Sequence, residues 1–459
     1  MIDPAEALSG RAGGRGIRAL LRSGMQREAL ATMLAAPVGL GRCRLRRVKL
    51  KPGRKLTAHY DISFEGAVGT RSVAVTWTAG PVAFGDVDEF AACDVKAGER
   101  GLLAPFRSLH SERPDLAMRV AVTPLDLTCT NLIDLCDRTY VSAMLNRVVD
   151  QWPRDTSVGI RTIRYRPGER HVLRYTSVAD TAQVFFAKIH RPSIAGDGAS
   201  LSRTQRGAAV AAALDGRLQA QTQNMRAAAP AAVLGPEGVV LYPSVPGRSL
   251  LAELVNGAAS AGPGLATAGE LLRTLHQDPG VQTVAVPRRN HHAEIAATRR
   301  ACEHITGLLP HLVGGLDQVM ERSADLLDRL PGEPEGFTHG DYKAEHVLTT
   351  SGGRTTLIDF DSCVQTGLSA DLGKFLADLR YWFVTWSRPG LDEAQRRFLA
   401  GYGLDAGDPT LNRARLYEAI LLVKLAARRV RVDDVDWSTR VSILVAEADA
   451  LVTRSTPRK

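Results

Sequence analysis

Apolar and polar positions along the chain follow two spacings. In the first half, apolar residues alternate with polar or basic residues over short runs, as at Val48 and Leu50 or at Val73 and Val75. This spacing predicts β-strands. In most of residues 265–455, apolar residues recur every three or four positions, which predicts helices. The chain is therefore expected to be an α+β protein, rich in strands before residue 245 and mainly helical after it.

The strand pattern occurs twice. Val-Lys-Leu-Lys-Pro-Gly at residues 48–53 matches Ile-Arg-Tyr-Arg-Pro-Gly at residues 163–168, and Tyr60 matches Tyr175 at the same separation of 115 residues. We interpret the match as an internal duplication, in which the first copy is degenerate. The alternative is that two basic β-hairpins converged on similar turn chemistry.

The two copies differ at a position that carries chemistry in the second copy. Lys188 lies within the apolar run Val-Phe-Phe-Ala-Lys-Ile, and a gapped alignment places Trp77 there in the first copy. Burying an ammonium group costs several kcal/mol unless an anion meets it. Lys188 is thus expected to face a bound anion, or else to lie on an edge strand facing water.

Two acidic segments form the strongest local pattern. Residues 338–348 read as an acidic loop followed by an apolar strand, and residues 356–361 as a second strand that ends in a carboxylate, with a Ser-Gly-Gly turn between them. This arrangement places Asp341 and Asp359 at the ends of neighbouring strands, where both face one pocket. Phosphoryl transfer from a nucleoside triphosphate needs one carboxylate for the acceptor hydroxyl and one for a divalent metal.

The spacing of these residues resembles the aminoglycoside phosphotransferase and choline kinase family, which has a protein-kinase-like fold. The family pattern is His-Gly-Asp, four residues, Asn, an apolar run and Ile-Asp-Phe with an acid next. The chain has His-Gly-Asp at residues 339–341, His346 in place of Asn, and Ile-Asp-Phe-Asp at residues 358–361. The resemblance implies that Asp341 is catalytic and that Asp359 and His346 bind the metal. His346 is the departure, because imidazole is a poor ligand for Mg²⁺.

The same resemblance assigns the nucleotide-binding residues. Lys188 is expected to contact the α- and β-phosphates, and Arg170, in the turn at residues 166–171, is expected to lie over the phosphates. Backbone groups near Tyr242 and Val245 resemble the inter-lobe hinge that binds adenine. No Glu occurs between Glu169 and Glu237, so the helix expected at residues 199–221 lacks the usual partner for the lysine.

The chain is expected to divide into three parts, of which the resemblance concerns the second and third. Residues 1–150 form an extra N-terminal α+β domain that acts as a cap. Residues 151–245 form the β-rich N-lobe and hinge, and residues 246–459 form the mainly helical C-lobe with the catalytic loop. The placement of a large segment ahead of the two kinase-like lobes is also similar to the architecture of bacterial maltose kinases.

Composition and charge indicate which partners and which cellular compartment the chain is expected to have. The chain carries a net charge of +9, but its basic residues are spread along the sequence and aromatic residues make up only 5%, so nucleic-acid binding is not expected. No apolar run reaches the ~20 residues of a membrane span, and the N-terminus lacks the apolar core of a secretion signal. The six cysteines are scattered without a Cys-x-x-Cys pair, which is typical of free thiols in the cytoplasm.

The expected function is ATP-dependent and Mg²⁺-dependent O-phosphorylation of a small hydroxylated molecule, such as an aminoglycoside-type antibiotic or a sugar. One alternative is a pseudokinase, a nucleotide-binding or regulatory module without phosphoryl transfer, because the helix glutamate is missing and Asn is replaced by His346. Another alternative, a basic nucleic-acid-binding protein, predicts an affinity that falls steeply with salt.

Overall fold

The structure is a computed structural model of the chain with two compact units. Unit 1 comprises Met1–Ser202, Pro230–Ser244 and Arg431–Asp433, and unit 2 comprises Arg203–Ala229, Val245–Val430 and Asp434–Lys459. The chain passes from unit 1 to unit 2 after Ser244, inside the segment predicted as a hinge. The structure describes residues 4–9, 13–35, 38–66, 69–80, 87–150, 152–153, 157–190, 202–222, 224–257, 261–405 and 407–455.

Unit 1 contains most of the strands. Its helices are α1 (Pro4–Leu8), α2 (Gly13–Arg22), α3 (Met25–Met33), α4 (Val87–Glu99), η1 (Pro114–Leu116), α5 (Leu132–Leu135) and α6 (Arg138–Val148). Its strands are β1 (Leu40–Lys51), β2 (Lys55–Phe64), β3 (Thr70–Thr78), β4 (His110–Arg113), β5 (Met118–Val122), β6 (Val158–Arg164), β7 (His171–Ser177), β8 (Val184–Ile189), β10 (Ala232–Leu234) and β11 (Val239–Pro243).

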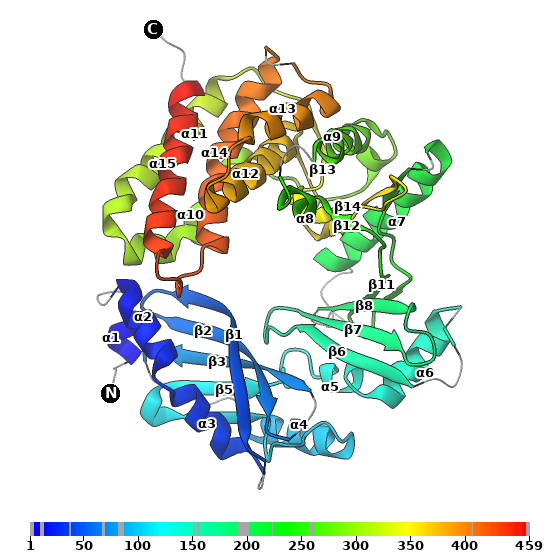
Figure 1. Ribbon diagram of the computed structural model, residues 1–459, viewed down its shortest axis with the longest axis vertical. Helices are drawn as coiled ribbons and strands as arrows, with labels where there is room; N and C mark the ends of the chain where they lie inside the picture. Colours follow the sequence, from blue (N-terminus) through cyan, green and yellow to red (C-terminus); the bar gives the residue numbers. More distant parts are fainter. Residues whose placement is uncertain are drawn as a thin grey trace. The chain divides into compact units, whose positions relative to one another are not determined.

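The two sheets of unit 1 have the same topology. The first five-stranded sheet has the order β1-β2-β3-β5-β4, and the second has the order β6-β7-β8-β11-β10, with every neighbouring pair antiparallel (Figure 1). In both sheets a three-stranded meander is extended by a later strand that pairs with the third strand. An internal duplication would produce this identity of strand order. The duplication itself stays a prediction.

Strand register corrects the alignment of Trp77 with Lys188. Thr57 pairs with Thr76 in the first sheet, and Val172, which follows Thr57 by the same 115 residues, pairs with Lys188 in the second. Thr76 therefore occupies the position of Lys188. Trp77 is fully buried on the opposite face, because a shift of one residue along a strand turns the side chain to the other side of the sheet.

The second sheet has one apolar and one mixed face. Phe185 and Ala187 of β8 belong to a buried cluster with Leu173 and Tyr175 of β7, and α6 covers this cluster with Val141, Met144 and Leu145. Lys188 lies between two of these buried positions and is itself half-buried. The predicted placement of a lysine within an apolar strand is confirmed, and its side chain leaves the sheet on the face away from the core.

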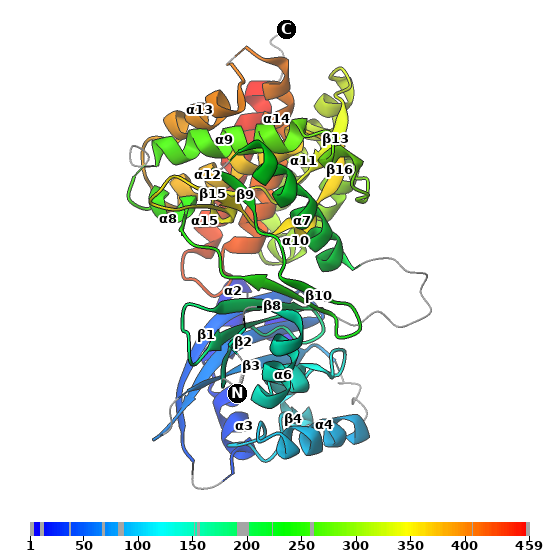
Figure 2. The same ribbon diagram turned by 90° about the vertical axis from the view of Figure 1, so that its right-hand side faces the viewer.

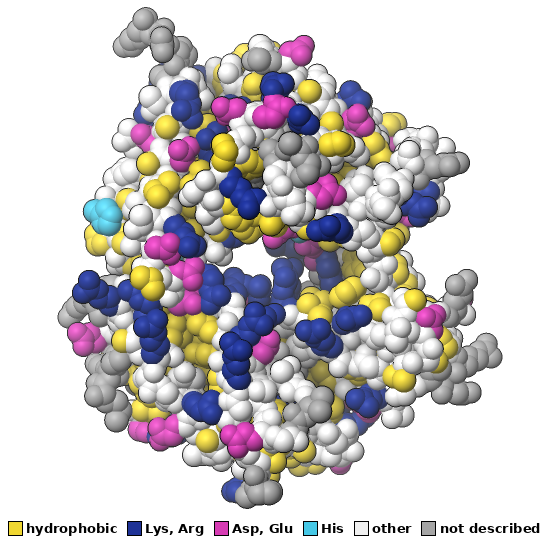
Figure 3. Space-filling model, viewed as in Figure 1, with side chains coloured by type: hydrophobic (Ala, Val, Ile, Leu, Met, Phe, Trp, Pro, Cys, Tyr) yellow, Lys and Arg dark blue, Asp and Glu magenta, His cyan; other side chains and the backbone are white. Residues whose placement is uncertain are grey.

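Basic side chains follow β1. Its exposed or half-buried positions include Arg42, Arg44, Arg46, Arg47 and Lys49, and Figure 3 shows Lys and Arg gathered over this strand. Acidic residues neutralise part of this charge, because Arg46 lies 3.2 Å from Asp61 and Lys49 pairs with Glu169. The basic stripe is therefore partly an ion-paired surface.

Unit 2 is mainly helical. Its helices are α7 (Arg203–Gln221), α8 (Leu250–Leu254), α9 (Gly262–Gln277), η2 (Val281–Thr283), α10 (His291–Leu308), η3 (Pro310–Leu312), α11 (Val313–Arg329), η4 (Ala344–His346), η5 (Phe360–Ser362), α12 (Ser369–Trp386), α13 (Leu391–Tyr402), α14 (Pro409–Arg429) and α15 (Trp437–Ser455). Its strands are β9 (Met225–Ala227), β12 (Arg248–Ser249), β13 (Glu335–Thr338), β14 (Val347–Thr349), β15 (Thr355–Leu357) and β16 (Val364–Gly367).

The α+β fold class is confirmed, with strands concentrated in unit 1 and helices in unit 2. The helix expected at residues 199–221 appears as α7 from Arg203, and its apolar face joins the core of unit 2 through Val210, Ala211 and Leu214. None of the helices in the described ranges combines the length and apolar character that a membrane span requires. The six cysteines are free thiols, as predicted.

Glycines allow the helices of unit 2 to approach closely. Helices α9 and α13 run side by side (Figure 2), and a Cβ atom at Gly269 would lie 2.2 Å from the carbonyl oxygen of Phe398. Helices α12 and α14 meet in the same way, because a Cβ atom at Gly373 would lie 2.4 Å from Cβ of Tyr417. Both contacts require a residue without a side chain.

We expect Gly373→Ala to lower the free energy of unfolding by about 1–3 kcal/mol, because the added methyl group forces α12 away from α14. Urea denaturation followed by circular dichroism measures the change. Gly216→Ala on α7 is the matched control. A Cβ atom at Gly216 meets no other atom within 4 Å, so alanine there should add about 0.5–1 kcal/mol through its helix propensity. Equal stabilities of the two variants would contradict this account.

Candidate functional site

The acidic segments form the predicted hairpin. Strand β14 follows the loop that contains Asp341, and β15 pairs with β14 and leads directly to Asp359. Gly340 has a φ of +73°, and a Cβ atom there would lie 2.1 Å from the carbonyl oxygen of Ser362. The His-Gly-Asp loop therefore packs directly on the turn that follows β15, and glycine is required at its centre.

Asp371 of α12 holds the first half of this loop. Its two carboxylate oxygens accept hydrogen bonds from the backbone N–H groups of His339, at 2.6 Å, and Gly340, at 2.9 Å. His276 lies 3.3 Å from the same carboxylate and also contacts the Tyr402 hydroxyl at 2.8 Å. Asp371 is buried, with 1% of its surface exposed. Asp371 therefore braces this loop, and His276 in turn contacts Asp371.

A second carboxylate holds the other half of the loop. Asp378, two helical turns after Asp371 on α12, accepts a hydrogen bond from the backbone N–H of Ala344 at 3.1 Å. Arg429 of α14 lies 3.0 Å from Asp378 and 2.9 Å from Glu345. The loop is thus fixed at both ends by side chains that come from helices distant in sequence.

Two lysines flank Asp341. Nζ of Lys343 lies 2.8 Å from Oδ2 of Asp341, and Nζ of Lys374 lies 3.2 Å from Oδ1. Burial by itself would raise the pKa of Asp341, but Lys374 and Lys343 outweigh it and hold that pKa far below its usual range. Asp341 is therefore ionised at neutral pH. The sequence interpretation missed both lysines as site residues. Lys343 stands inside the motif, whereas only the fold brings Lys374 from α12.

His346 joins Asp341 to Asp359. Its Nδ1 atom lies 3.0 Å from the backbone carbonyl oxygen of Asp341, and its Nε2 atom lies 3.4 Å from Oδ2 of Asp359. Burial lowers the pKa of His346 well below its ordinary value. Ile358 fixes the position of Asp359, because its N–H donates to the carbonyl oxygen of His346 at 3.0 Å and its carbonyl oxygen contacts His339 at 3.1 Å.

This side-chain set fits a divalent cation. Asp341, His346 and Asp359 each offer one ligand atom, and these atoms lie within 4.8 Å of one another. Asp359 has a left-handed backbone conformation, with φ of 67°, which is uncommon for a residue other than glycine. Such conformations cluster at functional sites. The three predicted residues of the C-terminal part are therefore brought together, and their chemical roles stay predictions.

The predicted nucleotide-binding residues lie in the second sheet, in the turn between β6 and β7, and directly after β11. Nζ of Lys188 lies 5.1 Å from the ring centre of Tyr242, on the neighbouring strand β11. Arg170 belongs to the tight turn between β6 and β7. Val245, the other hinge residue, is the first residue of the chain in unit 2 after that strand. The binding roles of these four residues stay predictions.

An aspartate that the sequence did not single out anchors the turn of Arg170. Asp126 is 5% exposed, and its Oδ2 atom accepts hydrogen bonds from the N–H of Gly168 at 2.9 Å and lies 2.8 Å from Nε2 of His171. A small pocket of about 60 Å³ lies here, lined in part by these residues and Arg170. The turn is therefore held by a buried side chain from the segment that precedes the second sheet.

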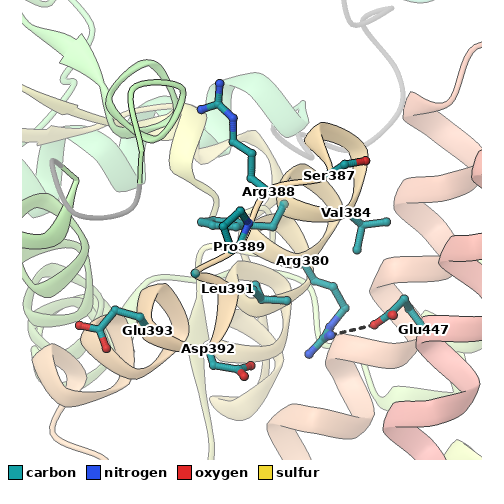
Figure 4. Close-up of a pocket in the computed structure, with 11 residues that line it drawn as sticks. Arg380, Val384, Ser387, Arg388, Pro389, Leu391, Asp392, Glu393 and Glu447 are labelled. Atoms are coloured by element: carbon teal, nitrogen blue, oxygen red, sulfur yellow. Dashed lines mark hydrogen bonds and ion pairs between the residues drawn. The ribbon is translucent and has the colours of Figure 1, made fainter.

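A larger pocket of about 470 Å³ contains none of the predicted site residues. It lies at the end of α12 and the start of α13, and Figure 4 shows Arg380 pointing toward Glu447 while Arg388 and Glu393 extend away from this pair. Arg380 lies 2.9 Å from Glu447 and 2.7 Å from the fully buried Glu418. These contacts join α12, α14 and α15, so the arginine has a structural role.

A protein-family model matches more than half of the chain. The model of the phosphotransferase enzyme family, APH, matches residues 163–417. No curated protein sequence matches the chain.

Several solved structures are similar at low identity. The GDP and kanamycin complex of APH(2")-IIia is 16% identical, with a TM-score of 0.46, over 68% of this chain and 98% of that chain. A choline/ethanolamine kinase family protein from Mesorhizobium loti is 19% identical, with a TM-score of 0.44, over 68% and 94%. Spectinomycin phosphotransferase APH(9)-Ia with ADP and spectinomycin is 11% identical, with a TM-score of 0.45, over 69% and 98%.

Proposed function

Because the chain belongs to the phosphotransferase enzyme family, we propose that it transfers the γ-phosphoryl group of ATP to a hydroxyl group of a small molecule. The observation that carries this proposal is the convergence of Asp341, His346 and Asp359, whose ligand atoms lie within 4.8 Å of one another. Phosphoryl transfer depends mainly on positioning and on charge neutralisation. The site supplies the carboxylates of Asp341 and Asp359 and, beside Asp341, the ammonium groups of two lysines, Lys343 and Lys374.

In this proposal Asp341 accepts a hydrogen bond from the acceptor hydroxyl and orients its oxygen toward the phosphorus atom. The low pKa of Asp341 makes the carboxylate a weak base, so it orients the hydroxyl and receives the proton only as the new P–O bond forms. Lys343 and Lys374 lie within 3.2 Å of Asp341 and place positive charge where the transferred phosphoryl group gains negative charge.

Asp359 and His346 are the proposed ligands of the divalent cation, which the family resemblance identifies as Mg²⁺. The cation, when bound, would neutralise charge on the β- and γ-phosphates. The role of Asp359 would then be to hold the cation in place. Ile358 would keep Asp359 in position through the two hydrogen bonds of its own backbone N–H and carbonyl oxygen.

The second sheet of unit 1 and the hinge segment that follows it are proposed to bind the rest of the nucleotide. Lys188 would contact the α- and β-phosphates, Arg170 the phosphate chain, and the backbone near Tyr242 and Val245 the adenine ring. The half-buried position of Lys188 in a strand supports its role, because a lysine there gains most from a bound anion.

Among acceptors we propose a polyhydroxylated small molecule, either an aminoglycoside-type antibiotic or a sugar. The test is to incubate the protein with ATP and a panel of such compounds, and to detect by mass spectrometry the compounds that gain one phosphate. Wild type is compared with Asp341→Ala and Asp359→Ala. Phosphorylation of a panel member that disappears in both variants supports the proposal, and turnover unchanged in both variants would overturn the site assignment.

The second candidate is a nucleotide-binding pseudokinase. One structural observation favours it: Asp215, the one acidic residue of α7, accepts hydrogen bonds from the backbone N–H of Ala227 at 3.1 Å and from the side chain of Gln219 at 2.7 Å, both in unit 2. Metal-dependent ATP binding without phosphate transfer to any acceptor would support the pseudokinase. Retention of Asp341, Asp359 and Lys188 supports the enzyme.

We expect Asp126→Asn to raise the KM for ATP about tenfold with little change in kcat, which corresponds to the loss of one charge-assisted hydrogen bond. The asparagine no longer accepts equally well from Gly168 and His171, so the turn that carries Arg170 loosens. Steady-state kinetics separate KM from kcat. The control is Asp180→Asn, in the turn between β7 and β8 of the same sheet, where the side chain of Asp180 accepts a local hydrogen bond from the N–H of Ala182 at 3.0 Å. A KM shift of the same size in both variants would contradict the prediction.

A further inference from the structure

The ring of His346 is held in one orientation. Nδ1 lies 3.0 Å from the backbone carbonyl oxygen of Asp341. A carbonyl oxygen can only accept a hydrogen bond, so Nδ1 carries the hydrogen. In the neutral ring the other nitrogen, Nε2, then presents a lone pair. The backbone of the catalytic loop therefore determines which nitrogen of His346 is available as a ligand.

This lone pair faces a carboxylate. Nε2 of His346 lies 3.4 Å from Oδ2 of Asp359, so that in the neutral ring two acceptor atoms face each other across a gap that a metal cation can bridge. An octahedral ion with bonds of ~2.1 Å separates neighbouring ligand atoms by ~3 Å. The observed separation is close to this value. His346 and Asp359 are therefore placed as two adjacent ligands of one ion.

A ligand pair of this kind selects among divalent cations. Mg²⁺ prefers oxygen ligands and retains its water, whereas imidazole suits first-row transition metals. We propose that the cation site of this chain, at Asp359 and His346, prefers a first-row transition-metal ion such as Mn²⁺ to Mg²⁺, with Nε2 of His346 as a direct ligand. The inference rests on the proposed function, because it concerns the metal that would accompany the nucleotide.

Replacement of the imidazole by an amide gives the sharpest contrast. His346→Asn supplies a carbonyl oxygen at a similar place and removes the nitrogen ligand. The ratio of the Kd for Mg²⁺ to the Kd for Mn²⁺ is expected to fall by about 10- to 100-fold in this variant, the range typical when a residue that supports a metal is changed. His346→Gln serves as a second variant if His346→Asn does not fold.

The experiment measures metal binding by electron paramagnetic resonance of Mn²⁺, with the full chain and a non-hydrolysable ATP analogue. Titration with Mg²⁺ displaces Mn²⁺ and yields both dissociation constants. Electron spin echo modulation detects the ¹⁴N nucleus of a coordinated imidazole directly. We expect this nitrogen signal in the wild type and its loss in His346→Asn.

A second cluster provides the control. His291, His292 and Asp328 also offer ligand atoms within 4.8 Å of one another, so they are an alternative source of a nitrogen signal. The signal is expected to persist in His292→Asn. A signal that survives His346→Asn, or that disappears in His292→Asn, would overturn the proposal, as would equal affinity of the wild type for Mg²⁺ and Mn²⁺.

These readouts are independent of turnover. A protein that coordinates Mn²⁺ through His346 and phosphorylates no acceptor would overturn the proposed function and support the metal inference. A protein that phosphorylates its acceptor with Mg²⁺ bound as tightly as Mn²⁺ would support the function and overturn the metal inference.

Discussion

Asp341→Asn is expected to lower kcat by about 10²- to 10⁴-fold, the usual contribution of a positioned acid–base group. The amide keeps the size of the carboxylate, but it removes the negative charge that orients the acceptor hydroxyl. Single-turnover phosphorylation of the acceptor identified by mass spectrometry measures the effect on the chemical step. The affinity for the ATP analogue should change little, because the change concerns the side chain that faces the acceptor.

The matched control for this variant is Asp392→Asn, an exposed carboxylate near the start of α13. It should retain full activity. A pH profile adds an independent readout. Because the two lysines hold the pKa of Asp341 far below its usual range, this carboxylate should cause no loss of activity as the pH falls from 7 through ~3.9, where an ordinary aspartate takes up its proton. Retention of wild-type kcat by Asp341→Asn would remove Asp341 from the mechanism.

Asp371→Asn is expected to affect both stability and activity. Asp371 accepts hydrogen bonds from the N–H groups of His339 and Gly340 through different oxygens. In asparagine one of these oxygens becomes an NH₂ group, which places a donor against a buried donor. We expect the free energy of unfolding to fall by about 1–3 kcal/mol, and kcat to fall about 10²-fold because the catalytic loop shifts.

Urea denaturation and steady-state kinetics on the same preparation test this prediction. The control is Asp436→Asn, which removes an exposed ion pair with Arg440 one helical turn away and should cost at most about 0.5 kcal/mol. A variant Asp371→Asn that is as stable and as active as the control would show that the loop keeps its geometry without this brace.

The local parts of the site could be predicted from the sequence because they are close in the chain. Asp341 and Asp359 are separated by one hairpin, and the apolar strands and the Ser-Gly-Gly turn specify that hairpin. The lysine in an apolar strand was equally clear, because the pattern around Lys188 is local. His346 was recognisable as a departure, since its place in the motif depends only on spacing.

Contacts between distant segments were not predictable in the same way. Lys374 comes to Asp341 from α12, Arg429 reaches Glu345 from α14, and Asp126 reaches the turn of Arg170 from another part of unit 1. The alignment of Trp77 with Lys188 was wrong for a related reason. A gap in a sequence alignment can fall anywhere in a loop, whereas strand pairing fixes the register to one residue.

The sequence by itself determined the family, the α+β class and the two carboxylates, because these depend on spacing within short segments. Only the tertiary structure decided the charge state of Asp341, the orientation of the His346 ring and the support given by Asp371. Each of these depends on groups brought together from separate helices and loops. Electrostatic and hydrogen-bond energies act across distances of a few ångströms in space, whatever the separation along the chain.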